Sequence, residues 1–195
     1  MCTHPTISLY TLLMKGFFTL YLLIFSFPVI LTAQKHDYNW LFGTDDNVGL
    51  ILVNFDQEPP SVSLIENPPL EFDLTNASIS DSTGNLLFYT NGIVVVNAQH
   101  QVMENGDSLN PGEVAWDFYN EGYPMNQGAL ILPKPSSDSL FYIFHAVREY
   151  PQSNIPSTFC SSFLYSLVNP YHNNGQGKVL EKNVVLVADT LDVSK

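Results

Sequence analysis

After residue 33 the chain alternates apolar and polar side chains with a period of two, and turn-forming residues interrupt the pattern at short intervals. This is the signature of half-buried β-strands, whereas an amphipathic helix repeats its apolar positions at three-and-four spacing. The alternation therefore predicts an all-β fold. The predicted strands cover residues 38–42, 49–55, 77–80, 85–90, 92–98, 100–103, 129–133, 140–147, 163–168 and 183–188.

The clearest predicted folding unit lies between residues 77 and 103. Asp81 opens a turn whose Gly84 can take a positive φ, and Asn91-Gly92 is a strong hairpin signal. A further reversal after Asn97 gives four antiparallel strands. A second four-stranded unit is predicted after residue 128, because Leu-Phe-Tyr at 87–89 recurs at 140–142. Repeated four-stranded meanders are typical of propeller blades.

Two such units cannot close a ring, since propellers need roughly four to eight blades. The expected fold is therefore a partial β-propeller of about two four-stranded antiparallel blades plus N-terminal strands, and the sequence favours a fragment of a longer chain. The predicted division is 34–76 for the N-terminal strands, 77–126 for the first blade with an aromatic loop, and 127–195 for the second blade. The alternative is a complete β-sandwich of about 8 to 10 strands.

Residues 1–33 have the pattern of a signal peptide. They contain Lys15 and no acidic residue, then an apolar run from Gly16 to Leu31, then the small residue Ala33. The run is shorter than the roughly 20 residues that a helix needs to span a bilayer. We expect a signal-peptide helix, cleavage after Ala33, and secretion or cell-surface exposure with no membrane span in the mature chain.

The charge balance bears on whether the protein could bind nucleic acids. Only 13% of the residues are charged, and the formal net charge is −12. The few basic residues are scattered, so no patch could neutralise a phosphate backbone, and nucleic-acid binding is not expected.

The open edges of the predicted blades have unpaired backbone groups, so they also predict self-association of the chain.

Several stretches together resemble the N-terminal region of long exported proteins of Bacteroidetes-type bacteria. They are NWLFG (39–43), ASISDSTGNLLFYTNG (77–92), QVMENG (101–106), QGALILPKP (127–135), SLFYIF (139–144), YSLV (165–168) and GKVLEKNVVL (177–186). In that family the segment looks like the start of a β-propeller, followed by PKD or Ig-like modules and a sorting domain for type IX secretion or gliding motility. The resemblance implies surface exposure and supplies no catalytic motif.

No standard catalytic or phosphate-binding motif occurs in the chain. The histidines are dispersed without metal-ligand spacing, so neither a metal nor another cofactor is expected. His145 lies in an apolar strand and is interpreted as a hydrogen-bonded structural residue. Cys160 is interpreted as a small structural residue; a catalytic thiol would need His145 as its base. The Asp81 turn is interpreted as a hairpin turn and not as a calcium-binding loop.

One loop between the two predicted units favours a binding function. Aromatic rings stack on sugar rings or anchor protein partners, and neighbouring acids can fix hydroxyl groups. The predicted binding residues are Trp116, Asp117, Tyr119, Glu121 and Tyr123.

These observations lead to a non-catalytic exported module that binds a glycan or a surface protein. The alternative function is a propeller-type carbohydrate-active enzyme fragment, in which Asp117 or Glu121 would supply the acid. An alternative for the loop itself is that its aromatic side chains fold back over the blade edges.

Overall fold

Antiparallel strands dominate the chain from residue 34 onward, which confirms the all-β prediction. The structure is a computed structural model that describes residues 34–43, 49–72, 74–151 and 159–191. The chain divides into two units, residues 1–33 and 34–195, and the description concerns the second. The predicted signal peptide lies outside the described residues.

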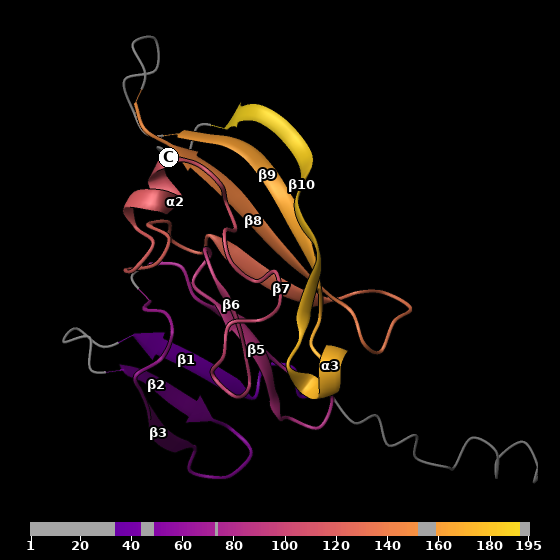
Figure 1. Ribbon diagram of the computed structural model, residues 1–195. Helices are drawn as coiled ribbons and strands as arrows, with labels where there is room; N and C mark the ends of the chain where they lie inside the picture. Colours follow the sequence, from indigo (N-terminus) through magenta and orange to yellow (C-terminus); the bar gives the residue numbers. More distant parts are fainter. Residues whose placement is uncertain (1–33, 44–48, 73, 152–158, 192–195) are drawn as a thin grey trace, which may run out of the picture. The chain divides into compact units, whose positions relative to one another are not determined.

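The strands form three successive sheets (Figure 1). The first sheet contains β1 (Asn39–Gly43), β2 (Gly49–Asn54) and β3 (Ser61–Glu66). The middle sheet contains β4 (Ala77–Ser80), β5 (Leu86–Thr90) and β6 (Val95–Asn97). The last sheet contains β7 (Ala129–Pro133), β8 (Phe141–Glu149), β9 (Phe159–Asn169) and β10 (Lys178–Leu191). Two short helical segments are α2 (Glu113–Asp117) and α3 (His172–Gly175). Each strand pairs with its neighbour in sequence, so every sheet is an antiparallel meander.

The predicted turns of the middle sheet are present. The Asp81 carboxylate accepts four hydrogen bonds from the backbone and side chains of Thr83 and Asn85, at 2.7–3.0 Å. Burial by itself would raise the pKa of Asp81, but these bonds outweigh it and lower the pKa to about 2. The segment is a side-chain-stabilised hairpin turn, as predicted. At the next turn, Asn91 Oδ1 accepts hydrogen bonds from the backbone N–H groups of Ile93 and Val94.

The predicted fourth strand of this unit is much shorter than expected. Only one bridge, between Val96 and Val102, joins residues 100–103 to β6. Asn97 and Met103 still form backbone hydrogen bonds across this pair, but the chain then turns, since the Gly106 N–H donates to the Met103 carbonyl and Glu104 bridges to Lys178 of β10. The middle unit therefore has three strands, and only the last sheet is the four-stranded meander that was predicted.

The N-terminal region holds a strand that the sequence reasoning missed. β3 follows Pro59 and Pro60, and most of its side chains are exposed, so its pattern has no clear buried face. It forms because Ser61–Glu66 pair in full register with β2. The described residues thus contain three sheets and no closed ring, and their strands do not merge into the two-sheet sandwich that was the alternative.

Both faces of the middle sheet are buried. Tyr89 and Val96 point into a core shared with Leu41 and Leu50 of the first sheet. Their neighbours Phe88 and Val95 point the opposite way, into a second core with Phe141 and Ile143 of the last sheet. Alternation along β5 and β6 therefore makes the middle sheet the layer between the other two.

The first strand of each sheet lies at one edge of that sheet, and these three edges come together. β1 contacts β4, and β4 contacts β7. Asn39 of β1 strengthens the first contact, since its side chain donates to Ser80 Oγ at 2.9 Å and to the Gly84 carbonyl at 2.7 Å. The three sheets therefore share an inner edge formed by β1, β4 and β7.

The matched Leu-Phe-Tyr triplets occupy different register positions in their sheets. Phe88 and Phe141 face each other across the second core, with ring centroids 5.8 Å apart and planes at 80°. The cross-strand pairs that correspond are Ile79 with Phe88 and Leu132 with Tyr142. A one-residue shift in the longer second turn reverses the direction of every side chain on the following strand.

Candidate functional site

The predicted aromatic loop begins with α2, which is anchored to the protein by its inner side. Val114 and Ala115 are buried in the first core. The backbone N–H of Trp116 donates to the Gly112 carbonyl at 3.1 Å, and that of Phe118 donates to Val114 at 3.1 Å. With its backbone fixed in this way, Trp116 is 81% exposed. A large aromatic side chain thus stands in solvent on an ordered support.

Asp117 and Tyr119 follow Trp116 along the same exposed segment, and Tyr150 reaches this segment from the end of β8. The Tyr150 hydroxyl donates to the Asp117 carboxylate at 2.8 Å. This hydrogen bond raises the pKa of Tyr150, because a charged acceptor favours the protonated phenol. Tyr119 is about half exposed, and its backbone N–H donates to the Trp116 carbonyl at 3.4 Å. We call Trp116, Asp117, Tyr119 and Tyr150 the aromatic platform.

Tyr123 has a different environment from the rest of the loop. It has no exposed surface, and its hydroxyl accepts the Arg148 backbone N–H at 2.5 Å. Burial raises its pKa to about 12. Tyr123 therefore supports the loop from within the first core. Glu121 is exposed, and its backbone N–H donates a hydrogen bond to the Phe118 carbonyl.

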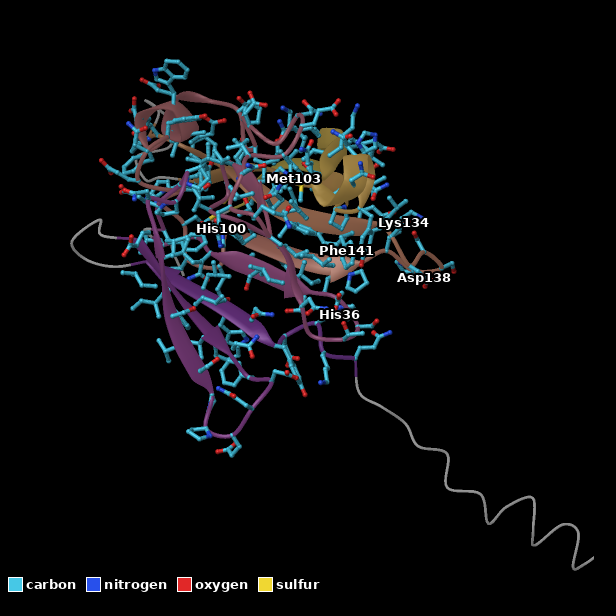
Figure 2. The ribbon with its side chains drawn as sticks, turned by 60° about the horizontal axis from the view of Figure 1, so that its bottom comes forward. His36, His100, Met103, Lys134, Asp138 and Phe141 are labelled. Carbon is cyan, nitrogen blue, oxygen red and sulfur yellow. The ribbon has the colours of Figure 1, made fainter. Side chains whose placement is uncertain are left out.

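A groove of about 510 Å³ opens along the shared inner edge of the three sheets. Its walls include Trp40 and Phe42 of β1 together with Leu130 and Leu132 of β7. His36 also lines the groove, where its Nδ1 lies 2.6 Å from the Ser80 carbonyl oxygen. The same imidazole packs edge-on against Phe141 at 6.3 Å, and both side chains are labelled in Figure 2. The groove is mainly apolar and holds few groups that could do chemistry.

His145 sits in a geometry that resembles a nucleophile–base–orienter set. Its Nε2 lies 3.0 Å from Ser166 Oγ, and its Nδ1 lies 2.6 Å from Asn110 Oδ1. All three side chains are buried, and the Ser166 oxygen also accepts the Asn183 N–H at 3.1 Å. Burial lowers the pKa of His145 to about 4, so the imidazole is neutral. No substrate could reach Ser166, and the set is a structural network, in line with the interpretation of His145.

Cys160 is likewise structural. It is buried in β9, and its sulfur lies 4.0 Å from the sulfur of Met125. Burial raises the pKa of the thiol, which disfavours the reactive thiolate. His145 bonds to Asn110 and Ser166 instead of acting as its base. Within the described ranges, no group of three or more His, Cys, Asp or Glu residues is placed to hold a metal ion.

The structure thus leaves Trp116, Asp117, Tyr119 and Glu121 exposed on one loop, and it buries Tyr123 in the first core. Tyr150 is the member of the platform that the sequence reasoning missed. It lies 33 residues from Asp117, at the end of β8, and only the chain fold brings the two together. The Tyr-Pro pair at 150–151, which ends a strand, was the available signal.

Comparison of the chain with protein-family models, with curated proteins and with solved structures gives no match. None of the helices in the described part of the chain is long and apolar enough to cross a membrane.

Proposed function

We propose that this chain is an exported, non-catalytic module of the β-propeller type that binds a glycan through the aromatic platform. Three observations support the propeller assignment. The sheets are antiparallel meanders, the first strand of each meets the next at a common inner edge, and the middle sheet is covered on both faces. Successive propeller blades pack in this manner. On this proposal the described residues provide three blades, where the sequence alone predicts two blades and N-terminal strands.

Export is proposed from the sequence of residues 1–33, with its basic residue, apolar run and small residue before Gln34. The resemblance to exported Bacteroidetes-type proteins supports the same compartment. The scarcity of charged residues and the acidic balance suit a surface protein that meets neutral or basic partners.

The observation that carries the binding proposal is the 81% exposure of Trp116 on an anchored segment. Exposing an indole to water is unfavourable, so such a side chain commonly marks a recognition surface. Sugar rings present flat C–H faces that stack on indole and phenol rings. The Asp117 carboxylate can accept hydroxyl hydrogen bonds beside them, since Tyr150 occupies only one of its acceptor positions.

Binding is tested with the purified full chain against a glycan array, followed by titration of the strongest ligand. The chain has two Trp residues, so a fluorescence change on binding that disappears in Trp116→Ala assigns the signal to the platform. We expect Trp116→Ala to weaken binding by about tenfold or more, which is 1.4 kcal/mol and typical of a lost aromatic stack. Tyr119→Ala should weaken it by a smaller factor.

The matched control is Tyr171→Ala, because Tyr171 is exposed to the same degree as Tyr119 but lies beside α3. It should bind as the unaltered chain does. Equal binding by Trp116→Ala would refute the proposal. Glycan turnover that is lost in Asp117→Asn would instead establish the enzyme alternative, and capture of a surface protein through Trp116 without any glycan would establish a protein ligand.

A further inference from the structure

The two terminal sheets each expose an apolar face. In the first sheet, Trp40 and Phe42 alternate with the buried Leu41, so they point away from the middle sheet. Val53 and Ile51 of β2 pair with Trp40 and Phe42 on one side and with Val62 and Leu64 of β3 on the other. The same face therefore continues to Val62 and Leu64, which are 67% and 48% exposed. Trp40 also packs on Phe55, with ring centroids 5.1 Å apart. This is the outer face of the first sheet.

The last sheet exposes a corresponding face. Leu130 and Leu132 of β7 alternate with the buried Ile131, and they pair with Phe144 and Tyr142 of β8. Beyond them Phe144 stacks on Phe163, with centroids 6.0 Å apart and planes at 11°. The hydrogen bond from Tyr165 to Glu181 is exposed on the same face, at 3.0 Å. This is the outer face of the last sheet.

These two faces are complementary in direction. Each sheet has a preceding face, directed toward the sheet before it in the chain, and a following face, directed toward the sheet after it. At each inner junction the following face of one sheet packs on the preceding face of the next, as the two cores show. Among the described residues, nothing packs on the preceding face of the first sheet or on the following face of the last sheet. A contact between the two outer faces would therefore repeat the geometry of the inner junctions. A contact between two copies of the same face would not.

The groove joins the two faces. Its walls combine Trp40 and Phe42 from one outer face with Leu130 and Leu132 from the other. Side chains of both faces thus line the same groove, together with residues of β4. A two-fold axis passing through the groove would place the first sheet of each copy on the last sheet of the other.

We propose that two copies of this chain associate through these faces and close a ring of six sheets. Three sheets cannot close, whereas six lie within the four to eight of known propellers. The ring has two identical junctions, each made by the outer face of a first sheet on the outer face of a last sheet. The ring rests on the propeller assignment proposed above. It is independent of the glycan ligand, and its failure would leave binding by the aromatic platform untouched.

The available apolar area is sufficient for a stable dimer. Eight large apolar side chains on the two faces are each about half exposed: Trp40, Phe42, Val62, Leu64, Leu130, Leu132, Phe163 and Val187. With roughly 180 Å² for a whole large side chain, they present on the order of 700 Å² per copy. Two copies would bury on the order of 1,400 Å², and specific stable interfaces bury roughly 1,200–2,000 Å².

The test is the molar mass of the purified full chain across a range of concentrations, measured by sedimentation equilibrium. We expect a plateau at twice the mass of one chain. Val62→Lys on one face, or Leu130→Lys on the other, should each raise the dissociation constant by more than about 100-fold, because each ring would bury two unpaired ammonium groups. Both positions are at least half exposed in the single chain, so the variants should fold.

Mixing the two variants distinguishes this arrangement from others. A mixed pair keeps one undamaged junction, between the first sheet of Leu130→Lys and the last sheet of Val62→Lys, so it should associate more tightly than either variant alone. Val102→Lys is the matched control, because Val102 is 46% exposed on the middle unit and should leave the dimer intact. A single-chain mass at all concentrations, a mass that grows without a plateau, or a dimer affected by only one of the two variants would overturn the proposal.

Discussion

The buried imidazole of His145 makes the stability of this protein depend on pH in a way that can be calculated. The side chain is 1% exposed, and burial lowers its pKa from 6.5 to about 4. As the pH falls below 6.5, the unfolded chain binds a proton at this position and the folded chain does not. The folded state therefore loses stability between pH 6.5 and about 4, and the effect is absent above pH 7.

The size of the effect follows from the two pKa values. At 1.36 kcal/mol per pH unit, folding loses about 2 kcal/mol at pH 5 relative to pH 8 through this group, and about 3 kcal/mol at pH 4. Such a loss is a large share of the 5–15 kcal/mol by which typical domains are stable. Comparison at pH 5 keeps the Asp81 carboxylate ionised, since its pKa is about 2.

The assay is urea unfolding followed by circular dichroism at pH 8, 7, 6 and 5, analysed by linear extrapolation. Between pH 8 and pH 5, the free energy of unfolding of His145→Gln should fall by about 2 kcal/mol less than that of the unaltered chain, because the neutral amide cannot titrate. Ser166→Ala serves as the control, since it removes the hydrogen bond to Nε2 and keeps the imidazole buried. It should be less stable by about 1 kcal/mol at every pH and retain the slope. Equal pH dependence in the unaltered chain and His145→Gln would refute the reasoning.

Other substitutions test the packing and the turns. Phe88→Ala, which empties a fully buried ring site between the middle and last sheets, should cost about 3–5 kcal/mol in the free energy of unfolding by urea. Gly92→Ala should cost more than Gly175→Ala by calorimetry, because both have left-handed φ but a Cβ at Gly92 would lie 2.8 Å from the Tyr123 Cβ, while nothing lies within 4 Å at Gly175. Asp81→Asn should remove a stabilising contribution that is present above pH 3.8 and lost as the pH falls through about 2, with a size on the order of 1 kcal/mol after solvent screening. An acid unfolding curve identical to that of the unaltered chain would contradict this last expectation.

Much of the strand pattern could be predicted because short-range chemistry determines it. β4 and β7 coincide with the segments predicted from alternation, and the Asp81 turn forms through hydrogen bonds within five residues. The strands β1, β2 and β5 begin or end within one residue of the predicted positions. By contrast, β3 has mostly exposed side chains and exists only because β2 offers it a pairing edge.

The candidate site was predicted in part. The loop rich in aromatic residues was evident in the sequence, but Trp116 and Tyr123 lie only seven positions apart in one local composition. One is exposed and the other is fully buried, because α2 packs Val114 on the first core while the chain after Gly122 turns inward. Tyr150 could not be placed beside Asp117 without the path of β8.

By itself the sequence determined the class of secondary structure, the main hairpin turns and the structural role of His145, since these depend on alternation and on the hydrogen-bonding capacity of nearby residues. Only the tertiary structure decided which way each strand faces. Phe88 and Phe141 match in sequence but point toward each other, because one residue added to a turn reverses a strand's faces. The stacking of three sheets and the two open apolar faces follow from those directions, which no local pattern specifies.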